Sequence, residues 1–330
     1  MKAFVVTKYG ADGLSLTDVP TPVVGPNDVL VDVKAASINP LDKMVRNGEF
    51  KQLLKYKLPF TLGHDFAGVI TQVGSSVRDF KVGDEIYARP RDLRIGTFAE
   101  SIAIDASDVA LKPSSLSFVE AAAVPLVALA AWQALVDVAE LKPGQKVLVH
   151  AGAGGLGSTV IQVAKYLGAF VATTAHTNDV DKARALGADE VIDFTTTDFS
   201  SVLSGYDVVL DSLGAASLEK SLTVLKPGGL AISVVGPPDP AFASQLGQPV
   251  LKPVMAAMSR KVRARAKKLG VRYSFFFMRA SGAQLKVLAG LYDSGTLRPV
   301  VDRTFDFDHT IEAMAYVEQG KASGKIVVTR

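Results

Sequence analysis

The chain has 330 residues, which is too long for one typical hydrophobic core and predicts about two domains. Its 48% hydrophobic and 21% charged residues are typical of a globular protein and exclude a largely disordered or fibrous one. The net charge of +3 is small and gives no support to nucleic-acid binding. The absence of cysteine excludes disulfide bonds and every zinc site with thiolate ligands.

Neither the N-terminal residues nor the longest apolar run predicts a targeting or membrane segment. The first residues, MKAFVVTKYG, lack the apolar core of a signal peptide. The longest apolar run, residues 121–132, is too short to span a bilayer and contains Pro125. We therefore expect a cytoplasmic protein without membrane association.

Residues 1–120 are rich in glycine and proline and carry short alternating apolar runs, such as residues 29–33 and 66–73. Turn signals such as Gly25-Pro26-Asn27 separate these runs. Short strands at this spacing predict a small β-rich, barrel-like domain. Residues 118–136 then predict a helix, with Ser117 and Glu120 at capping-box spacing and a kink at the proline.

Residues 147–165, VLVHAGAGGLGSTVIQVAK, predict a strand, a glycine turn and an amphipathic helix in immediate succession. Gly152, Gly154 and Gly157 give the G-x-G-x-x-G spacing of a dinucleotide-binding turn, with Gly155 and Leu156 between them. The first glycine permits the bend, the second admits a pyrophosphate, and the third allows close packing of helix on strand. The alternative is a purely structural glycine-rich turn.

Strands and helices alternate after this turn, which predicts a doubly wound α/β domain with a parallel sheet over residues 121–277. The expected strands are residues 170–174, 191–193, 208–211 and 230–234, and the expected helices are residues 181–186 and 218–225. Residues 274–278, SFFFM, predict a buried last strand.

The remaining segments are a basic helix and a tail. Residues 253–268 predict a helix with six crowded cations and no acid, either a solvated face or a positive rim that attracts an anionic cofactor or substrate. The tail contains a helix at residues 282–292 and short strands around a helix at residues 310–318. Because it resembles the first domain in texture, we expect residues 278–330 to complete that domain.

The end of the second strand of the doubly wound domain indicates which dinucleotide binds. An NAD site needs a carboxylate there for the adenosine 2′-hydroxyl, but no acid occurs before Asp179. Hydroxyl and imidazole groups suit a 2′-phosphate instead, which predicts NADP(H), although a polar loop without this role is the alternative. The candidate ligands are Thr174, His176, Thr177 and Lys182.

At the level of motifs, residues 144–165 resemble the signature of the zinc-free quinone oxidoreductase (zeta-crystallin-like) branch of the medium-chain dehydrogenase/reductase superfamily. Further similar stretches are ASINPLD at residues 36–42, LGHDFAG at 62–68, VGDEIYA at 82–88, VVLDSLG at 208–214, KPGG at 226–229 and GKIVV at 324–328. The resemblance implies a GroES-like first domain, a Rossmann domain, and a homodimer joined through the edge strand at residues 274–278.

Zinc-dependent members of this superfamily use a Cys/His/Cys ligand set. Asn39 stands here where the first cysteine would be, although His64, Asp65 and Asp42 leave a His/carboxylate site conceivable. We expect no metal, because a lone histidine beside a turn is more often structural. Without a Lewis acid, reduction of an activated acceptor is the better hypothesis than alcohol oxidation.

The resemblance also implies a set of site residues. Asn39 would lie beside the nicotinamide, with Tyr87 a candidate catalytic residue or a core aromatic. Tyr56, Lys43 and solvent are the other candidate proton donors. The cofactor would contact Asp211, Leu213, Val234, Val235, Gly236, Phe276 and, at the phosphate, Lys321.

The resulting hypothesis is an NADPH-dependent, zinc-independent oxidoreductase that transfers hydride to a quinone or an α,β-unsaturated carbonyl, where positioning and oxyanion stabilisation supply most of the catalysis. The alternatives are an enoyl-thioester (enoyl-CoA) reductase, for which the basic helix would meet the substrate phosphates, and a non-catalytic NADPH-binding protein.

Overall fold

A computed structural model describes residues 1–320 and 322–330, so the predicted phosphate contact at Lys321 lies outside the described residues. The chain divides into two compact units. Unit 1 contains residues 1–129 and 279–330, and unit 2 contains residues 130–278. No helix within the described residues is both long and apolar enough to cross a membrane.

Unit 1 is built on a seven-stranded, mostly antiparallel sheet and a smaller sheet of three strands. The large sheet has the order β15-β16-β3-β5-β6-β8, and β7 pairs with β3. Its strands are β3 (Asp28–Ile38), β5 (Asp65–Val73), β6 (Glu85–Ala88), β7 (Ser101–Asp105), β8 (Val109–Leu111), β15 (Val301–Asp306) and β16 (Lys325–Thr329). The small sheet consists of β1 (Lys2–Val6), β2 (Leu14–Asp18) and β4 (Phe60–Thr61).

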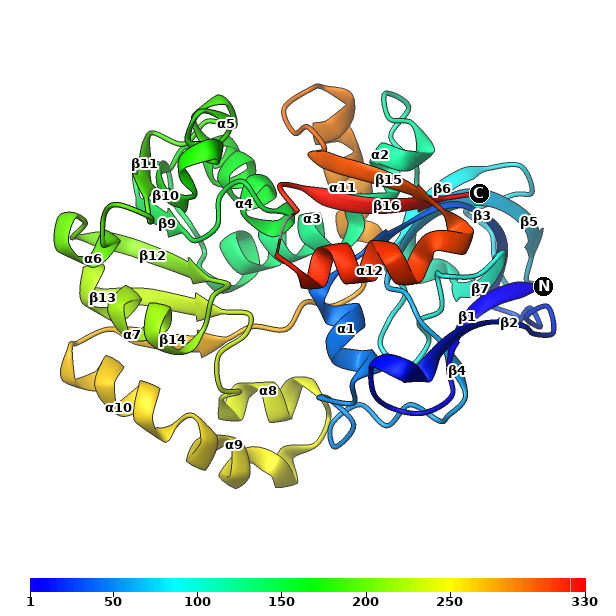
Figure 1. Ribbon diagram of the computed structural model, residues 1–330, viewed down its shortest axis with the longest axis horizontal. Coiled ribbons are helices and arrows are strands. Elements are labelled where there is room, and N and C mark those ends of the chain that lie inside the picture. The colour runs from blue at the N-terminus through cyan, green and yellow to red at the C-terminus, as the bar shows by residue number, and fades with distance from the viewer. Residues whose placement is uncertain (321) are drawn as a thin grey trace. The chain divides into compact units, whose positions relative to one another are not determined.

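The tail of the chain joins the large sheet. β16 pairs antiparallel with β3, with Ile326 opposite Ile38, so the tail supplies strands to a sheet whose other strands come from residues 28–111. Figure 1 shows the red β16 beside the blue β3. Buried side chains such as Val31, Phe66 and Val328 form the core of this unit. Its helices are α1 (Pro40–Arg46), α2 (Phe118–Ala122), α11 (Gly282–Asp293) and α12 (Thr310–Glu318).

The prediction of one continuous helix over residues 118–136 is wrong. α2 ends at Ala122, and α3 (Pro125–Trp132) begins at the proline. Proline lacks an N–H donor but fits the first turn of a helix, so it starts the second helix rather than kinking one long helix. The chain continues as a π-helix over Gln133–Val138.

Unit 2 is a six-stranded sheet in the order β11-β10-β9-β12-β13-β14, and every neighbouring pair is parallel. This is the doubly wound arrangement, with its switch in strand order between β9 and β12. Its strands are β9 (Lys146–Val149), β10 (Phe170–Ala175), β11 (Glu190–Asp193), β12 (Tyr206–Asp211), β13 (Leu225–Ser233) and β14 (Arg272–Phe275). Its helices are α4 (Gly155–Tyr166), α5 (Val180–Ala185), α6 (Phe199–Val202), α7 (Ala215–Val224), α8 (Pro240–Gln245), α9 (Lys252–Met258) and α10 (Arg260–Lys268).

The structure places the last strand earlier than residues 274–278. β14 pairs with residues 230–233 of β13 and ends at Phe275, level with the end of its neighbour. Phe276, Phe277 and Met278 remain buried after leaving the sheet, which explains why their apolar run read as a strand. β14 lies at an edge of the sheet, as the predicted dimer strand should.

Candidate functional site

The glycine turn lies at the carboxyl end of β9, in the centre of the parallel sheet, where it leads into α4. A Cβ added to Gly152 would lie 2.2 Å from the Thr173 hydroxyl oxygen, and one added to Gly157 would lie 2.2 Å from the Ala151 carbonyl oxygen. A Cβ on Gly154 would meet only that carbonyl oxygen, at 3.3 Å. The fold therefore requires the two outer glycines, whereas the middle one leaves surface open to a ligand.

The first turn of α4 begins at this open surface. Gly155, Leu156 and Gly157 supply backbone N–H groups that have no partner within a helix, at the positive end of its dipole. Such a helix start binds phosphate groups. The strand, turn and helix predicted around the glycines are therefore confirmed, and this cradle suits a pyrophosphate.

A buried hydrogen-bond chain supports the turn from beneath. The Ala151 N–H donates to Thr174 Oγ1 at 3.2 Å, and that oxygen lies 3.2 Å from His150 Nδ1. On the other side of the ring, His150 Nε2 lies 2.8 Å from Ser221 Oγ, which donates to the Ser217 carbonyl. Because the Ser221 hydroxyl donates its hydrogen to Ser217, it accepts from His150 Nε2. Burial lowers the His150 pKa to about 4 and so favours the neutral ring, in which Nδ1 accepts from Thr174 Oγ1.

These hydrogen bonds correct the assignment of the Thr174 side chain to the 2′-phosphate. The side chain is 2% exposed and its hydroxyl lies between Ala151 and His150. Its neighbours Thr173 and Ala175 are buried as well, because both faces of this central parallel strand are covered.

Two loops that follow β12 and β13 are tied together by the buried Asp211 carboxylate. It accepts hydrogen bonds from the Leu213 and Gly214 N–H groups, and from Ser233 Oγ at 2.7 Å. Ser233 Oγ in turn accepts from the Gly236 N–H at 2.8 Å. Asp211 is therefore a positioning residue, which the sequence suggested only as a cofactor contact.

Several predicted contact residues cluster around these loops. Leu213 is 56% exposed and Val235 43% exposed, so both offer apolar surface at the carboxyl end of the sheet. Val234 donates its N–H to the Asp211 carbonyl. Phe276 is buried and donates its N–H to the Ser233 carbonyl, so its backbone supports the loop.

The end of β10 carries the other residues predicted to recognise the 2′-phosphate. His176 is exposed, and its Nδ1 accepts from the Asn178 N–H. Thr177 Oγ1 donates to the Asp193 carboxylate at 2.7 Å, a partner that the sequence did not predict. Lys182 lies half-buried on α5.

Asp193 is the acid that sequence reasoning missed in this region. It ends β11, opposite Ala175 of β10, and also accepts from the Thr195 N–H and hydroxyl. These hydrogen bonds lower the Asp193 pKa. The sequence feature that could have revealed Asp193 is a carboxylate at the end of β11, the strand next to β10.

Unit 1 contains a second, separate polar cluster at the carboxyl end of β3. Asn39 Oδ1 accepts from Lys325 Nζ at 2.5 Å, and Asn39 Nδ2 donates to Asp65 Oδ2 at 2.9 Å. The pairing of Ile38 with Ile326 and of Ser37 with Asp65 brings these residues together. All three are buried. Lys325 was missed, although a lysine at the start of the apolar stretch KIVVT is a visible anomaly.

His64 lies beside this cluster. Its Nδ1 is 2.6 Å from Asp42 Oδ1, and Asp42 Oδ2 accepts from the Asn39 N–H at 2.7 Å. His64 Nε2 is buried and has no hydrogen-bond partner. The described residues contain no group of three or more His, Cys, Asp or Glu side chains able to hold a metal ion.

Tyr87 lies elsewhere in unit 1 and is fully buried in β6. Its hydroxyl donates to the Leu285 carbonyl of α11 at 2.6 Å, and burial raises the pKa of the phenol. These facts correct its candidacy as a catalytic residue and favour the alternative that it is a core aromatic. Tyr56, the other tyrosine considered, accepts from the Leu93 N–H.

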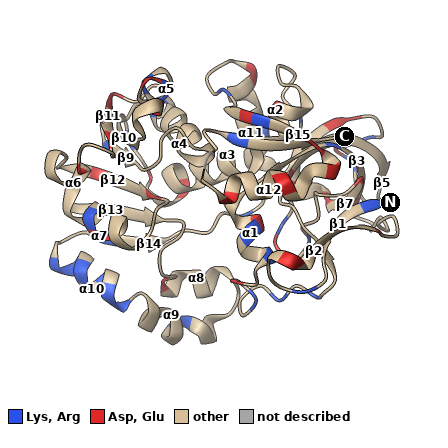
Figure 2. Ribbon diagram, viewed as in Figure 1, with Lys and Arg blue, Asp and Glu red and all other residues tan. Residues whose placement is uncertain are grey.

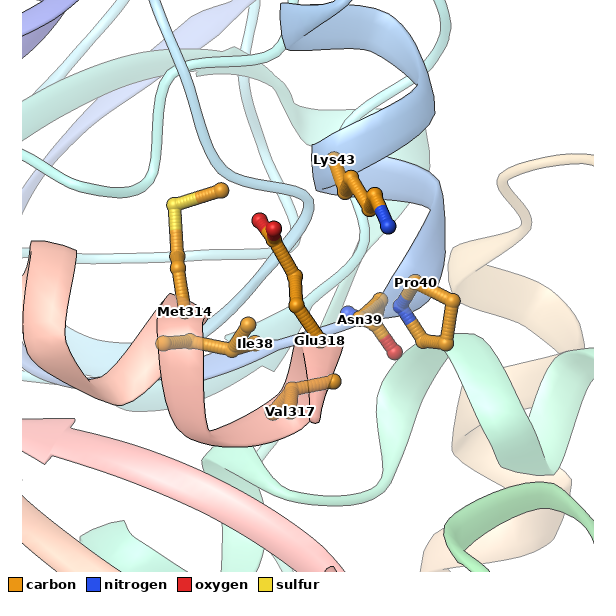
Figure 3. A pocket seen from close by; sticks show the side chains of 7 residues that line it. All are labelled: Ile38, Asn39, Pro40, Lys43, Met314, Val317 and Glu318. Atoms are coloured by element: carbon orange, nitrogen blue, oxygen red, sulfur yellow. The ribbon is translucent and has the colours of Figure 1, made fainter. Parts of the chain in front are cut away.

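A small pocket of about 190 Å³ adjoins Asn39. Figure 3 shows Lys43 of α1 and Glu318 of α12 on either side of it, with Pro40 and Asn39 beside them. Of the proton donors considered, Lys43 is therefore the side chain that the structure brings close to Asn39.

The basic segment forms α10, whose charged side chains are exposed while Val262 and Ala266 face the core. Figure 2 shows this row of blue residues. Lys261 pairs with Glu219 at 2.6 Å. This exposure agrees with a solvated helix face, and the alternative of a positive rim for an anionic ligand stays a prediction.

Comparison with known proteins places this architecture in a class. Residues 25–114 match the alcohol dehydrogenase GroES-like domain, and residues 186–328 match a family described as zinc-binding dehydrogenase. The class is therefore that of two-part dehydrogenases and reductases with a GroES-like and a Rossmann domain.

Individual relatives refine this class. The chain is 36% identical to a 2-methylene-furan-3-one reductase of Solanum lycopersicum, over 99% of the chain and 79% of the relative. It is 35% identical to an NADPH-dependent alkenal/one oxidoreductase, chloroplastic, of Arabidopsis thaliana, with the same two coverages. The quinone oxidoreductase of Coxiella burnetii superposes with a TM-score of 0.87 at 31% identity, covering 100% of this chain and 99% of that one. The chain belongs to the quinone oxidoreductase branch of the medium-chain dehydrogenase/reductase superfamily.

The residues present do not fit the zinc that one family description implies. No cysteine is available, both Asp65 oxygens accept hydrogen bonds, and Asn39 Oδ1 is bound by an ammonium group. A divalent ion at this position would lie beside the Lys325 cation and be repelled by it.

Proposed function

We propose that this protein is a zinc-independent, NADPH-dependent reductase of α,β-unsaturated carbonyl compounds or quinones. The observation that carries the proposal is similarity over 99% of the chain to two relatives named for enone-type substrates. Membership of the family makes the chain an NADP(H)-dependent oxidoreductase. The class of acceptor, the site residues and the zinc independence are the parts that we propose.

The glycine turn and the start of α4 would hold the pyrophosphate of NADPH, since Gly154 leaves that surface open. His176 and Lys182 would contact the 2′-phosphate, with Thr177 placed to join them if it released Asp193. The loops tied by Asp211 would lie against the nicotinamide ribose and carboxamide. When bound, the cofactor supplies a hydride for the β-carbon of an enone or for a quinone ring.

The chain's own residues would then stabilise and protonate the oxygen on which negative charge develops. Asn39 offers an amide donor of fixed direction, and such preorganised donors are worth about 10²–10³ in rate. We propose Lys43 as the proton donor, because its flexible side chain lines the pocket beside Asn39.

We also propose a homodimer joined through the edge of the unit 2 sheet at β14. Sedimentation of the purified protein would test this proposal, since a monomer at all concentrations would contradict it. A cytoplasmic location stays a prediction, because one close relative is described as chloroplastic.

The activity is tested by following NADPH consumption with 1,4-naphthoquinone, an alkenal and a trans-2-enoyl-CoA. We expect turnover with the quinone or the alkenal, and NADPH to be preferred to NADH. A preference for the thioester would support the enoyl-CoA reductase alternative instead. Tight NADPH binding without turnover of any acceptor would contradict the proposal.

A further inference from the structure

The cluster around Asn39 contains a cation that belongs to the chain itself. The Lys325 side chain is 6% exposed, and its ammonium lies 2.5 Å from Asn39 Oδ1 and 3.3 Å from Asp65 Oδ2. Asp65 is fully buried and accepts three further hydrogen bonds, from Ser37 Oγ, Asn39 Nδ2 and the Leu126 N–H. One ammonium and one carboxylate are therefore paired inside unit 1.

A buried ammonium is costly unless it is paired and hydrogen-bonded. Burial lowers the Lys325 pKa, and the nearby Asp65 and Asp42 carboxylates oppose that effect. The position of the ammonium is set by backbone pairing, because Ile326 lies opposite Ile38 and so places Lys325 against Asn39. The sheet register thus delivers a positive charge to this point.

The ammonium and the carboxylate together fix the orientation of the Asn39 amide. Oδ1 faces a cation and Nδ2 faces an anion. A half-turn of the amide would place its N–H groups against the ammonium and its oxygen against the carboxylate, and both contacts would be repulsive. The second Nδ2 hydrogen has only the Ser37 carbonyl at 3.5 Å, the outer limit of hydrogen bonding, so it is available to a ligand.

We propose that Lys325 is the resident cation of this site. Its ammonium holds the Asn39 amide in the orientation that the reaction uses, and it occupies the oxygen atoms that a divalent metal would need. Lys325 is thus a positioning residue that acts through Asn39. The catalytic part of this statement rests on the proposed function, whereas the part that concerns metal binding does not.

The side-chain atoms near Lys325 that remain free to bind a ligand are too few for a metal site. Within the described residues of the cluster, His64 Nε2 is the buried side-chain atom without a partner, and a single imidazole does not make a zinc site. The other ring nitrogen of His64 is held by Asp42. A metal would have to displace Lys325 before it gained a second ligand.

A double-mutant cycle on Lys325 and Asn39 tests the positioning role. We expect Lys325→Met to lower kcat by about 10- to 100-fold, which is the usual effect of losing a group that orients a site residue. NADPH affinity should stay within twofold, because the cofactor cradle lies in unit 2. Asn39→Ala should lower kcat similarly, and the double variant should be no worse than Asn39→Ala alone. Losses that multiply would overturn the proposal.

A second lysine whose side chain is largely covered provides the control. Lys112 is 7% exposed in the side chain, lies in the same unit, and donates to the Leu116 carbonyl while pairing with Glu85. Lys112→Met should lower the melting temperature without lowering kcat. If Lys325→Met does not fold, Lys325→Met with Asp65→Asn removes both buried charges, and the same loss of kcat is expected of it.

Two further readouts do not depend on turnover. The Asn39 side-chain amide signal, assigned by its absence in Asn39→Ala, should exchange slowly with solvent in the wild type and in Lys112→Met, but fast in Lys325→Met. In equilibrium dialysis against Zn²⁺, wild type and His64→Ala should retain equal amounts of metal. Stoichiometric zinc that is lost in His64→Ala, or equal amide exchange in all variants, would overturn the inference even if no acceptor is reduced.

Discussion

Replacement of the middle glycine of the turn by alanine should separate cofactor binding from folding. A Cβ on Gly154 would meet only the Ala151 carbonyl oxygen, at 3.3 Å, and Gly154 has a φ of −73°, which alanine adopts freely. The same change at Gly157 would place a methyl group 2.2 Å from a backbone oxygen that cannot move without disturbing the turn. The fold therefore tolerates Gly154→Ala but not Gly157→Ala.

The magnitudes follow from these positions. Gly154 is the N-cap of α4, where alanine is disfavoured by up to about 1 kcal/mol, and loss of a glycine from the unfolded chain returns about 0.4–1 kcal/mol. The free energy of unfolding should therefore change by less than about 1 kcal/mol. A methyl group between the backbone and a phosphate disrupts one charge-assisted hydrogen bond, worth about 1.5–3 kcal/mol, so Kd for NADPH should rise about 10- to 100-fold.

The assay combines nicotinamide fluorescence for Kd with thermal unfolding for stability. Gly154→Ala should melt within a few degrees of wild type and bind NADPH weakly, whereas Gly157→Ala should melt at a clearly lower temperature. Wild-type affinity in a folded Gly154→Ala protein would refute the assignment of this surface to the pyrophosphate.

Four other changes have expected outcomes. The His150 pKa of about 4 lies below its unfolded value of 6.5, so its contribution to the free energy of unfolding is present above pH 6.5 and is lost as pH falls towards 4. Between these pH values wild type should lose on the order of 3 kcal/mol of stability through this group, and His150→Gln should not show that loss in unfolding experiments. Tyr87→Phe should cost about 0.5–1.5 kcal/mol, because it removes the hydrogen bond to the Leu285 carbonyl while that carbonyl keeps its partner within α11; kcat should be unchanged, whereas a large loss of kcat would restore the catalytic role of Tyr87. Lys182→Ala should weaken NADPH binding several-fold and leave NADH binding unchanged, as competition assays would reveal. Lys43→Met should lower kcat by about 10²- to 10⁴-fold, the usual contribution of a positioned proton donor, and an unaltered kcat would assign the proton to solvent.

The parallel sheet of unit 2 could be predicted because its signals are local. Each strand is a short apolar run, each helix has its own periodicity, and the glycine turn joins one of each. The errors fall where local signals are ambiguous. In the sequence, Pro125 fits a kink within one helix as well as the start of a second helix, and only packing decides between the two. Residues 276–278 are as apolar as a strand, but no neighbouring strand continues beside them.

The candidate site was predictable only where chemistry follows from chain order. Gly152, Gly154 and Gly157 shape the turn through their own backbone, so their spacing predicted its conformation, and their contact with a cofactor stays a prediction. Thr174 failed because β10 is a central strand of a parallel sheet, in which residues on both faces are buried: Thr173 is 0% and Thr174 2% exposed, and both hydroxyls are bonded inside the protein. Asp193 was missed because it belongs to the neighbouring strand and reaches Thr177 only through sheet pairing.

Lys325 shows the same limit with a larger consequence. It is 286 residues from Asn39 in the sequence, and no spacing rule connects the two. What connects them is the register of β16 on β3, which also completes the large sheet of unit 1. Because one set of backbone hydrogen bonds fixes both the last strand and the buried ammonium, detachment of the tail would remove the cation and leave Asp65 as an unpaired buried charge. If Lys325 orients Asn39 as we propose, pairing of β16 with β3 also sets the Asn39 amide, and treatment with a chelator should leave that orientation unchanged.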